Sequence, residues 1–237
     1  MSIKKLFLSF CIIALFTGGC LVGDSDKDDP KIGEINNINQ LTMGGGVFIF
    51  REQGFGLAQF GTFNEIEPYE EATVYVNGVE LANNGGIHSN AAPLSIETLT
   101  TEQSLRIAVY ALGDSVVSDL AIPEDPVIVK PEEGVSVHAG DSLYVEVGFP
   151  GDPQYIAITL IDQEAFAVGY ETEKPNSLLS LTIPGEKLPN TGTFPLNAYS
   201  INMSADKIPN NFNMNKQYEM FLAASVVMRN IEFTETE

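Results

Sequence analysis

Short apolar runs with a period of two constrain the fold of this chain more than any other feature. From about Leu41 onward, Gly, Pro, Asn and Asp interrupt the sequence every few residues, and apolar residues often occupy alternate positions between them, as from Leu143 to Val147. Such alternation lines one face of a β-strand. No segment before the last carries the sustained i, i+3, i+4 stripe of an amphipathic helix. We therefore expect an all-β protein with few helices.

Several strands can be placed individually. Thr73–Val76 and Val79–Leu81 flank Asn77-Gly78, a pair that favours the positive φ angles of a type I′ turn and predicts a hairpin. The nearly continuous apolar run from Ile156 to Ile161 predicts a central strand that is buried on both faces. Alternation predicts further strands around 105–109, 143–147, 179–183 and 194–198, with a turn at Gly113-Asp114.

The last segment, Tyr218 to Phe233, is long enough for a helix but is rich in β-branched and aromatic residues. These residue types prefer the pleated sheet, so we expect two contiguous strands there. A weak internal repeat supports this expectation, since Ser115-Val116-Val117 in the first half matches Ser225-Val226-Val227 in the second.

A proline-rich stretch separates the two halves. Pro123 and Pro126 stiffen the connection and predict a domain boundary. With 44% hydrophobic residues, the chain can build a core on each side. We expect a first β-sandwich over 41–122, a linker over 123–126 and a second β-sandwich over 127–237.

Both halves resemble bacterial surface domains of the immunoglobulin-like and fibronectin-type-III-like families. In the first half the resemblance rests on ATVYVNGVEL, the alternating strand before the Gly-Asp turn, and Ile122-Pro123. In the second half it rests on the run from Pro131 to Leu143, which is similar to the proline-bearing first strand, turn and second strand of such modules. The resemblance implies two tandem immunoglobulin-like β-sandwiches, although the chain has no tryptophan and no cysteine pair for an inter-sheet disulfide.

The first twenty residues have the layout of a secretory leader. Lys4 and Lys5 precede an apolar run from Leu6 to Phe16, which is too short to span a bilayer as a helix, and Thr17-Gly18-Gly19-Cys20 follows. A cysteine after small residues resembles the lipobox of bacterial lipoproteins, with Thr17 where that family usually has leucine. The resemblance implies a signal peptide over 1–19, cleavage, and a lipid on Cys20. Ordinary secretion and an uncleaved anchor are the alternatives.

Lipid attachment at Cys20 would limit the chemistry of the mature chain. Cys11 would leave with the leader, so no thiol and no disulfide would remain. Several acyl chains would hold the protein stably at the outer membrane, where we expect it on the cell surface or on the periplasmic face.

Residues 20–40 are polar and acidic and are expected to form a flexible tether. Asp24, Asp26 and Asp28 alternate as at the start of a calcium loop, but positions six and twelve of that loop would be Asp29 and Ile35 in place of Gly and Glu. We therefore expect no metal site. The cluster resembles the acidic export tag of some Bacteroidetes lipoproteins, and an inert tether is the alternative.

The chain's charge excludes one class of partner. It has 12 basic and 32 acidic residues, a net charge of −20 that repels nucleic-acid backbones. The expected partners are therefore the membrane, through the Cys20 lipid, and an envelope protein or glycan.

Catalytic signatures are absent from the sequence. The only histidines, His88 and His138, lie in polar surroundings and are interpreted as exposed loop residues. The sequence has neither a Gly-x-Ser-x-Gly elbow nor a His-Glu-x-x-His motif. We expect no catalytic residues, no cofactor and no enzyme activity.

Aromatic and glycine residues are dense from Met43 to Phe63. Two core-facing strands are one interpretation, and a platform for stacking sugars or peptides is the other. The expected function is that of a lipid-anchored, non-catalytic structural or recognition protein of the cell envelope. The alternative is a carbohydrate- or peptide-binding surface component that uses the aromatic residues between 48 and 69.

Overall fold

The computed structural model describes residues 36–64, 67–95, 97, 99–100, 104–161, 166–172, 178–204 and 219–235. Strands dominate these residues, and the helices among them are short 3-10 turns: η1 (Ile38–Gln40), η2 (Arg51–Gln53) and η4 (Gly185–Lys187). Within the same ranges, no helix is both long enough and apolar enough to cross a membrane. The predicted all-β class is confirmed.

Strands follow one another closely along the described chain. The first half contains β1 (Thr42–Phe50), β2 (Phe55–Asn64), β3 (Glu67–Pro68), β4 (Thr73–Val76), β5 (Val79–Glu80), β6 (Ala82–Asn84), β7 (Ile87–Ser89), β8 (Leu94–Ser95), β9 (Ser104–Ala111) and β10 (Asp114–Ala121). The second half contains β11 (Val127–Lys130), β12 (Ser136–His138), β13 (Leu143–Gly148), β14 (Tyr155–Ile161), β15 (Phe166–Thr172), β16 (Leu178–Ile183), β17 (Gly192–Met203) and β18 (Glu219–Thr234).

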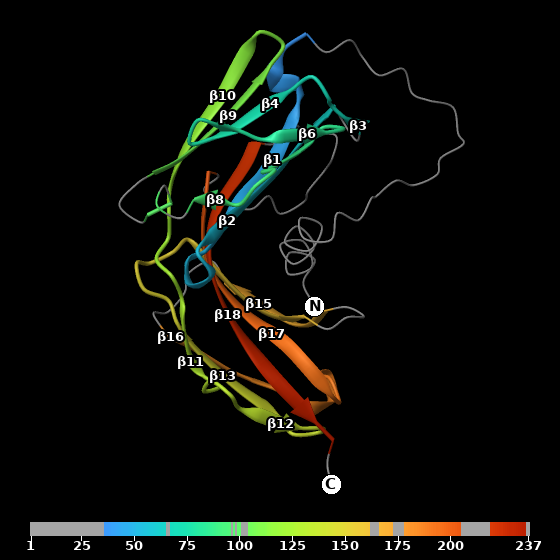
Figure 1. Cartoon of the computed structure of the whole chain (residues 1–237), viewed down its shortest axis with the longest axis vertical. Coiled ribbons are helices and arrows are strands. Elements are labelled where there is room, and N and C mark those ends of the chain that lie inside the picture. The colour runs from blue at the N-terminus through green and yellow to red at the C-terminus, as the bar shows by residue number, and fades with distance from the viewer. Residues whose placement is uncertain are drawn as a thin grey trace, which may run out of the picture.

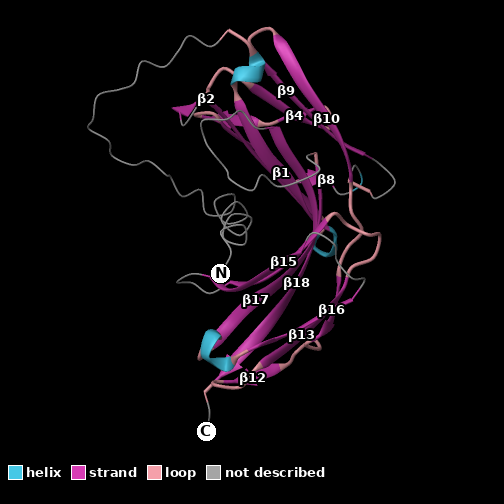
Figure 2. Cartoon of the chain, turned by 180° about the vertical axis from the view of Figure 1, so that it is seen from behind, coloured by secondary structure: helices cyan, strands magenta, loops and turns pink. Residues whose placement is uncertain are grey.

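These strands form three sheets. The largest, here called the shared sheet, runs through both halves in the order β15-β14-β17-β18-β1-β2-β7-β6, with β12 added on β18 and with β3 and β8 added on β2. The first outer sheet has the order β10-β9-β4-β5, and the second outer sheet has the order β11-β13-β16. Each outer sheet packs against one half of the shared sheet, which gives two tandem sandwiches (Figures 1 and 2).

The second sandwich has the immunoglobulin-like arrangement. Its β18, β17, β14 and β15 lie side by side in one layer, and its β11, β13 and β16 form the other. This is the separation of strands G, F, C and C′ from strands A, B and E that defines that fold. The short strand β12 pairs in parallel with the end of β18.

Strand β18 belongs to both sandwiches. Its first residues, Glu219–Ser225, pair in parallel with β1, and its residues from Leu222 to Phe233 pair antiparallel with β17. Phe221 and Ala223 point into the first core, whereas Ile231 and Phe233 point into the second. Figure 1 shows β18 passing from one sandwich to the other. The segment expected to serve the second sandwich alone therefore completes the first one as well.

Each sandwich encloses its own apolar core. The first core takes residues from β1, β2, β4, β9, β10 and β18, and Val74, Leu105 and Ile107 are completely or almost completely buried. The second takes residues from β11 to β14 and β16 to β18, including Val145 and Ile158. A further buried cluster lies on the opposite face of the shared sheet, where residues of β1, β14, β17 and β18 alternate with those of the two cores.

The alternation rules located most strands correctly. Asn77 and Gly78 have φ angles of 48° and 80°, so the predicted type I′ hairpin between β4 and β5 is confirmed. Residues Tyr155–Leu160 of β14 are all buried, with Ile156 and Ile158 facing one cluster and Tyr155 and Ala157 facing another. This confirms the central strand that is buried on both faces.

The last segment differs from the prediction. The two contiguous strands expected between Tyr218 and Phe233 are one uninterrupted strand, β18, because β17 pairs with it without a break in register from Leu222 to Phe233. Ser225-Val226-Val227 lies in the middle of this strand, whereas Ser115-Val116-Val117 follows the turn at Leu112-Gly113. The proposed internal repeat therefore has no structural counterpart in the second half.

The ordered chain begins before Leu41. Residues 36–40, expected to belong to the flexible tether, include η1, whose first turn is closed by a capping box between Asn37 and Gln40. The side chains of Ile38 and Leu41 are each only 1% exposed, because both pack into the first core. The rest of that tether lies outside the described residues. The domain boundaries at 41–122, 123–126 and 127–237 stay a prediction.

Candidate functional site

The predicted lipid-attachment residue lies outside the part of the chain that the structure describes. The same holds for Asp24, Asp26 and Asp28, so neither the lipid on Cys20 nor the export-tag hypothesis is tested by the fold. Within the described residues, no group of three or more His, Cys, Asp or Glu side chains is arranged to hold a metal ion.

The two histidines occupy different environments. His138 is exposed, as expected, but it lies on β12, where its Nδ1 is 2.9 Å from the Thr234 hydroxyl. His88 was predicted to be an exposed loop residue, and that prediction is wrong: it lies on β7 and is 0% exposed. Its position opposite Phe60 of β2 directs the imidazole into the first sandwich.

The hairpin that carries His88 has a local cause. Gly85 and Gly86 have φ angles of 62° and 78°, which form a two-residue turn between β6 and β7. The Asn83 side chain accepts a hydrogen bond from the Gly86 N–H at 2.9 Å and donates one to the Glu70 carbonyl at 2.6 Å. The Gly-Gly pair is a hairpin signal that could have placed His88 on a strand.

The contacts of the His88 imidazole favour one tautomer of its neutral form. The Thr62 hydroxyl donates to the Tyr69 carbonyl at 2.8 Å, so at 3.3 Å from His88 Nε2 it acts as the acceptor. Nε2 therefore carries the proton, and the Nδ1 atom has no hydrogen-bond partner among the described residues. Burial lowers the pKa of His88, because removal from water penalises the charged form.

The aromatic residues between 48 and 69 do not form the stacking platform that was one interpretation of this segment. Phe48, Phe50 and Phe60 are 2%, 7% and 1% exposed, and they pack into buried clusters on the two faces of the shared sheet. The alternative interpretation, two core-facing strands, describes β1 and β2 correctly.

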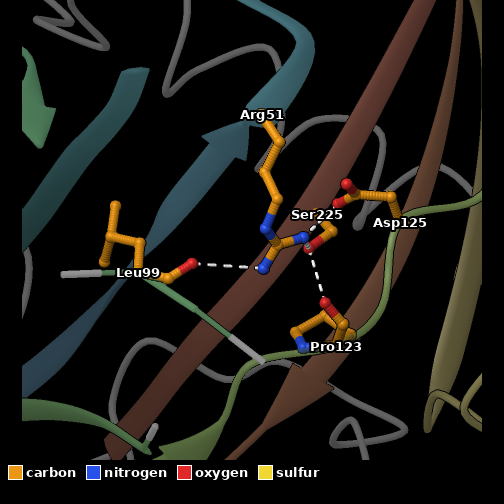
Figure 3. A network of polar contacts seen from close by, with 5 residues as sticks. All are labelled: Arg51, Leu99, Pro123, Asp125 and Ser225. Carbon is orange, nitrogen blue, oxygen red and sulfur yellow. Dashed lines mark hydrogen bonds and ion pairs between the residues drawn. The ribbon is translucent and has the colours of Figure 1, made fainter. Parts of the chain in front are cut away.

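A polar network at the junction of the two sandwiches fixes the linker (Figure 3). Arg51, which follows β1 directly, forms an ion pair with Asp125 of the linker and donates hydrogen bonds to Ser225 Oγ at 3.0 Å and to the Leu99 carbonyl at 3.2 Å. Ser225 of β18 donates in turn to the Pro123 carbonyl at 2.7 Å. One guanidinium thus connects β1, the linker and the shared strand.

Further side chains hold the chain on both sides of this linker. Asn202 of β17 donates to the Ala121 carbonyl at 2.9 Å, at the end of β10. Arg229 of β18 donates to the carbonyls of Ile128 and Pro131 at 2.9 and 2.6 Å. Side chains from η2, β17 and β18 therefore hold the linker and the residues on either side of it.

An open hollow lies on the solvent-facing side of the first outer sheet. Its volume is about 390 Å³, and it is lined by Thr73, Tyr75, Gly78, Arg106, Ala108 and Tyr110. The Tyr75 and Tyr110 rings meet edge to face, with centroids 5.6 Å apart. Nothing in the sequence indicated that these tyrosines form a site. The alternation in β4 and β9 did place them on the solvent-facing side of the sheet, away from the core-facing residues.

No protein family matches the chain, and no curated protein is significantly similar to it. Among solved structures, the fibronectin(III)-like modules of Clostridium thermocellum CbhA are 9% identical, with 82% of this chain and 94% of that chain covered and a TM-score of 0.28. The human OSCAR ligand-binding domain is 12% identical, with 78% and 97% covered and a TM-score of 0.25. A Ca²⁺-stabilized adhesin that helps an Antarctic bacterium reach out and bind ice is 11% identical, with 81% and 49% covered and a TM-score of 0.28. Similarity this distant carries no information about function.

Proposed function

We propose that this protein is a lipid-anchored, non-catalytic protein of the cell envelope that displays two fixed β-sandwiches for a structural or recognition role. The observation that carries the proposal is the junction of the sandwiches. There a shared strand and the Arg51 network join the two cores. Such a unit keeps its loops and outer faces in a fixed relation to one another, as a display protein requires.

The anchor belongs to the same proposal. Cys20 follows a basic head and a short apolar run, and fifteen residues separate it from the first described residue, Asn36. Acylation there would attach the protein to the outer membrane, with its sandwiches on the cell surface or in the periplasm.

Metabolic labelling with a palmitate analogue in a bacterial host tests the anchor. The wild-type chain is expected to incorporate the label and to sediment with membranes, and its mature form should begin at residue 20. Cys20→Ala should lose both the label and the membrane association. Cys11→Ala is the matched control, because this cysteine lies within the leader and should leave both unchanged. An unlabelled wild type, or a labelled Cys20→Ala, would contradict the proposal.

Protease treatment of intact and of permeabilised cells then assigns the membrane face. Degradation in intact cells would place the sandwiches on the outside. Degradation only after permeabilisation would place them in the periplasm, and in that case the acids after Cys20 would not be an export tag.

A further inference from the structure

The hollow on the first outer sheet is formed by a small residue between two tyrosines. Ala108 of β9 lies directly opposite Tyr75 of β4, and Tyr110 lies two residues further along β9, opposite Thr73. Side chains at these positions share one face of the sheet. The methyl group of Ala108 leaves space between larger neighbours, so Ala108 forms the floor and the tyrosines and Arg106 form the walls.

The aromatic walls are held in place before any ligand arrives. The Tyr75 hydroxyl donates to Glu80 Oε2 at 3.0 Å across the β4–β5 hairpin, and the two rings contact each other edge to face at 89°. The Tyr110 side chain nevertheless stays exposed: the residue is 48% accessible. Rigid aromatic side chains on paired strands bind at a low cost in conformational entropy.

The polar rim offers both donors and acceptors. Arg106 lies beside Asp119 of β10, with Nη1 and Oδ2 3.4 Å apart, and both side chains are more than half exposed. Glu80 of β5 lies next to the hollow, since it pairs with Tyr75 and accepts the hydrogen bond of the Tyr75 hydroxyl. The carboxylates of Glu80 and Asp119 disfavour an anionic ligand, whereas Arg106 disfavours a cationic one. An uncharged ligand rich in hydroxyl groups fits this rim, because each hydroxyl can accept from the guanidinium and donate to a carboxylate.

We propose that this hollow binds an uncharged sugar ring of a glycan, whose apolar C–H face stacks on Tyr110 and whose hydroxyls bond to Arg106 and the rim carboxylates. Apolar and aromatic side chains with a few polar groups line the hollow, as is usual for ligand pockets. Its volume lies at the small end of the range of such pockets. The inference rests on the recognition role proposed above and gives that role a ligand class and a surface.

The inference is tested by measuring the binding of the purified full-length chain to immobilised oligosaccharides. The assay uses a detergent that contains no sugar. The probes are neutral oligomers of glucose, mannose, galactose and xylose, with oligogalacturonate as the anionic probe and a lysine-rich peptide as the cationic one. We expect saturable binding to at least one neutral oligomer. Tyr110→Ala should weaken it at least about tenfold, since the stacking face would be lost.

Tyr144→Ala supplies the matched control. Tyr144 is 46% exposed on β13 of the second outer sheet, and its hydroxyl donates to Glu146 Oε2 at 2.9 Å, much as Tyr75 bonds to Glu80. This variant should bind like the wild type. Thermal unfolding of both variants shows that each keeps its fold, so a loss of binding in Tyr110→Ala alone reports on the site.

Three outcomes would overturn the inference: no binding to any neutral oligomer, binding restricted to the charged probes, or equal effects of Tyr110→Ala and Tyr144→Ala. The labelling of Cys20 and the binding at Tyr110 share no readout. A failed anchor with intact glycan binding would therefore refute the lipid anchor alone, and the reverse result would refute only the ligand assignment.

Discussion

At the scale of single residues, His88 shows how a polar sequence context can conceal a buried group. The preceding residues 83–86 are Asn and Gly, because β6 is exposed and the turn requires positive φ angles. The strand period nevertheless places the His88 side chain opposite Phe60 and inside the sandwich. The polar residues Asn83 and Asn84 are exposed, but their exposure does not extend to His88 on the next strand.

The buried imidazole should make stability depend on pH in a known direction. Burial lowers the pKa of His88 in the folded chain, so as pH falls the unfolded chain takes up the proton first. The contribution of neutral His88 is fully present above the unfolded pKa of about 6.5 and is lost progressively as pH falls below it. The urea concentration at the unfolding midpoint of the wild type should therefore decrease when the pH is lowered from 7.5 to 5.5.

Two variants separate the contribution of His88 to the pH dependence of stability from the contributions of other titrating groups. His88→Gln removes the titrating group and keeps a donor near Thr62, so its midpoint should change less over the same pH interval than that of the wild type. His138→Gln removes the exposed histidine and should retain the wild-type pH dependence. An unchanged pH dependence in His88→Gln would refute the assignment of the effect to His88.

At the scale of elements, the contact between β1 and β18 is where the two sandwiches meet. Gly46 pairs with Leu222 in register, and a Cβ atom at Gly46 would lie 2.3 Å from Leu222 Cδ1 and 2.9 Å from the Leu222 carbonyl oxygen. Leu222 is itself only 2% exposed, so it has little room to move away. Glycine is thus required at this position by the close approach of the neighbouring strand.

Gly46→Ala should destabilise the protein by about 1–3 kcal/mol, the usual cost of overpacking a buried site. Gly44→Ala is the control on the same strand, because a Cβ atom there would meet only the Met220 carbonyl oxygen, at an ordinary 3.5 Å. Urea unfolding of both variants measures the difference. Equal midpoints for the two variants would show that β1 does not approach β18 in the way described.

The sequence predicted elements better than it predicted their pairing. Local rules located the Asn77-Gly78 hairpin and the buried strand β14, because turn chemistry and alternation act over a few residues. The parallel pairing of β1 with β18 joins opposite ends of the described chain, and no local pattern encodes it. The same limit applies to the hollow, where Tyr75 and Tyr110 become neighbours only through the pairing of β4 with β9.

At the scale of the whole molecule, the two sandwiches depend on each other. Phe221 and Ala223 of β18 complete the first core, while Val227 and Ile231 of the same strand complete the second. Arg51 and Ser225 bind the linker to this strand at the crossing point (Figure 3). Unfolding of either sandwich would therefore remove a strand from the other one, so we infer a single cooperative unit in place of two independent domains.

Scanning calorimetry of the full-length chain tests this claim most directly. A single cooperative unit predicts one endotherm in which the calorimetric enthalpy equals the van't Hoff enthalpy. Phe221→Ala, which acts on the first core, should lower the temperature of that one transition without splitting it. Two separable transitions in the wild type, with only one of them moved by Phe221→Ala, would contradict the account.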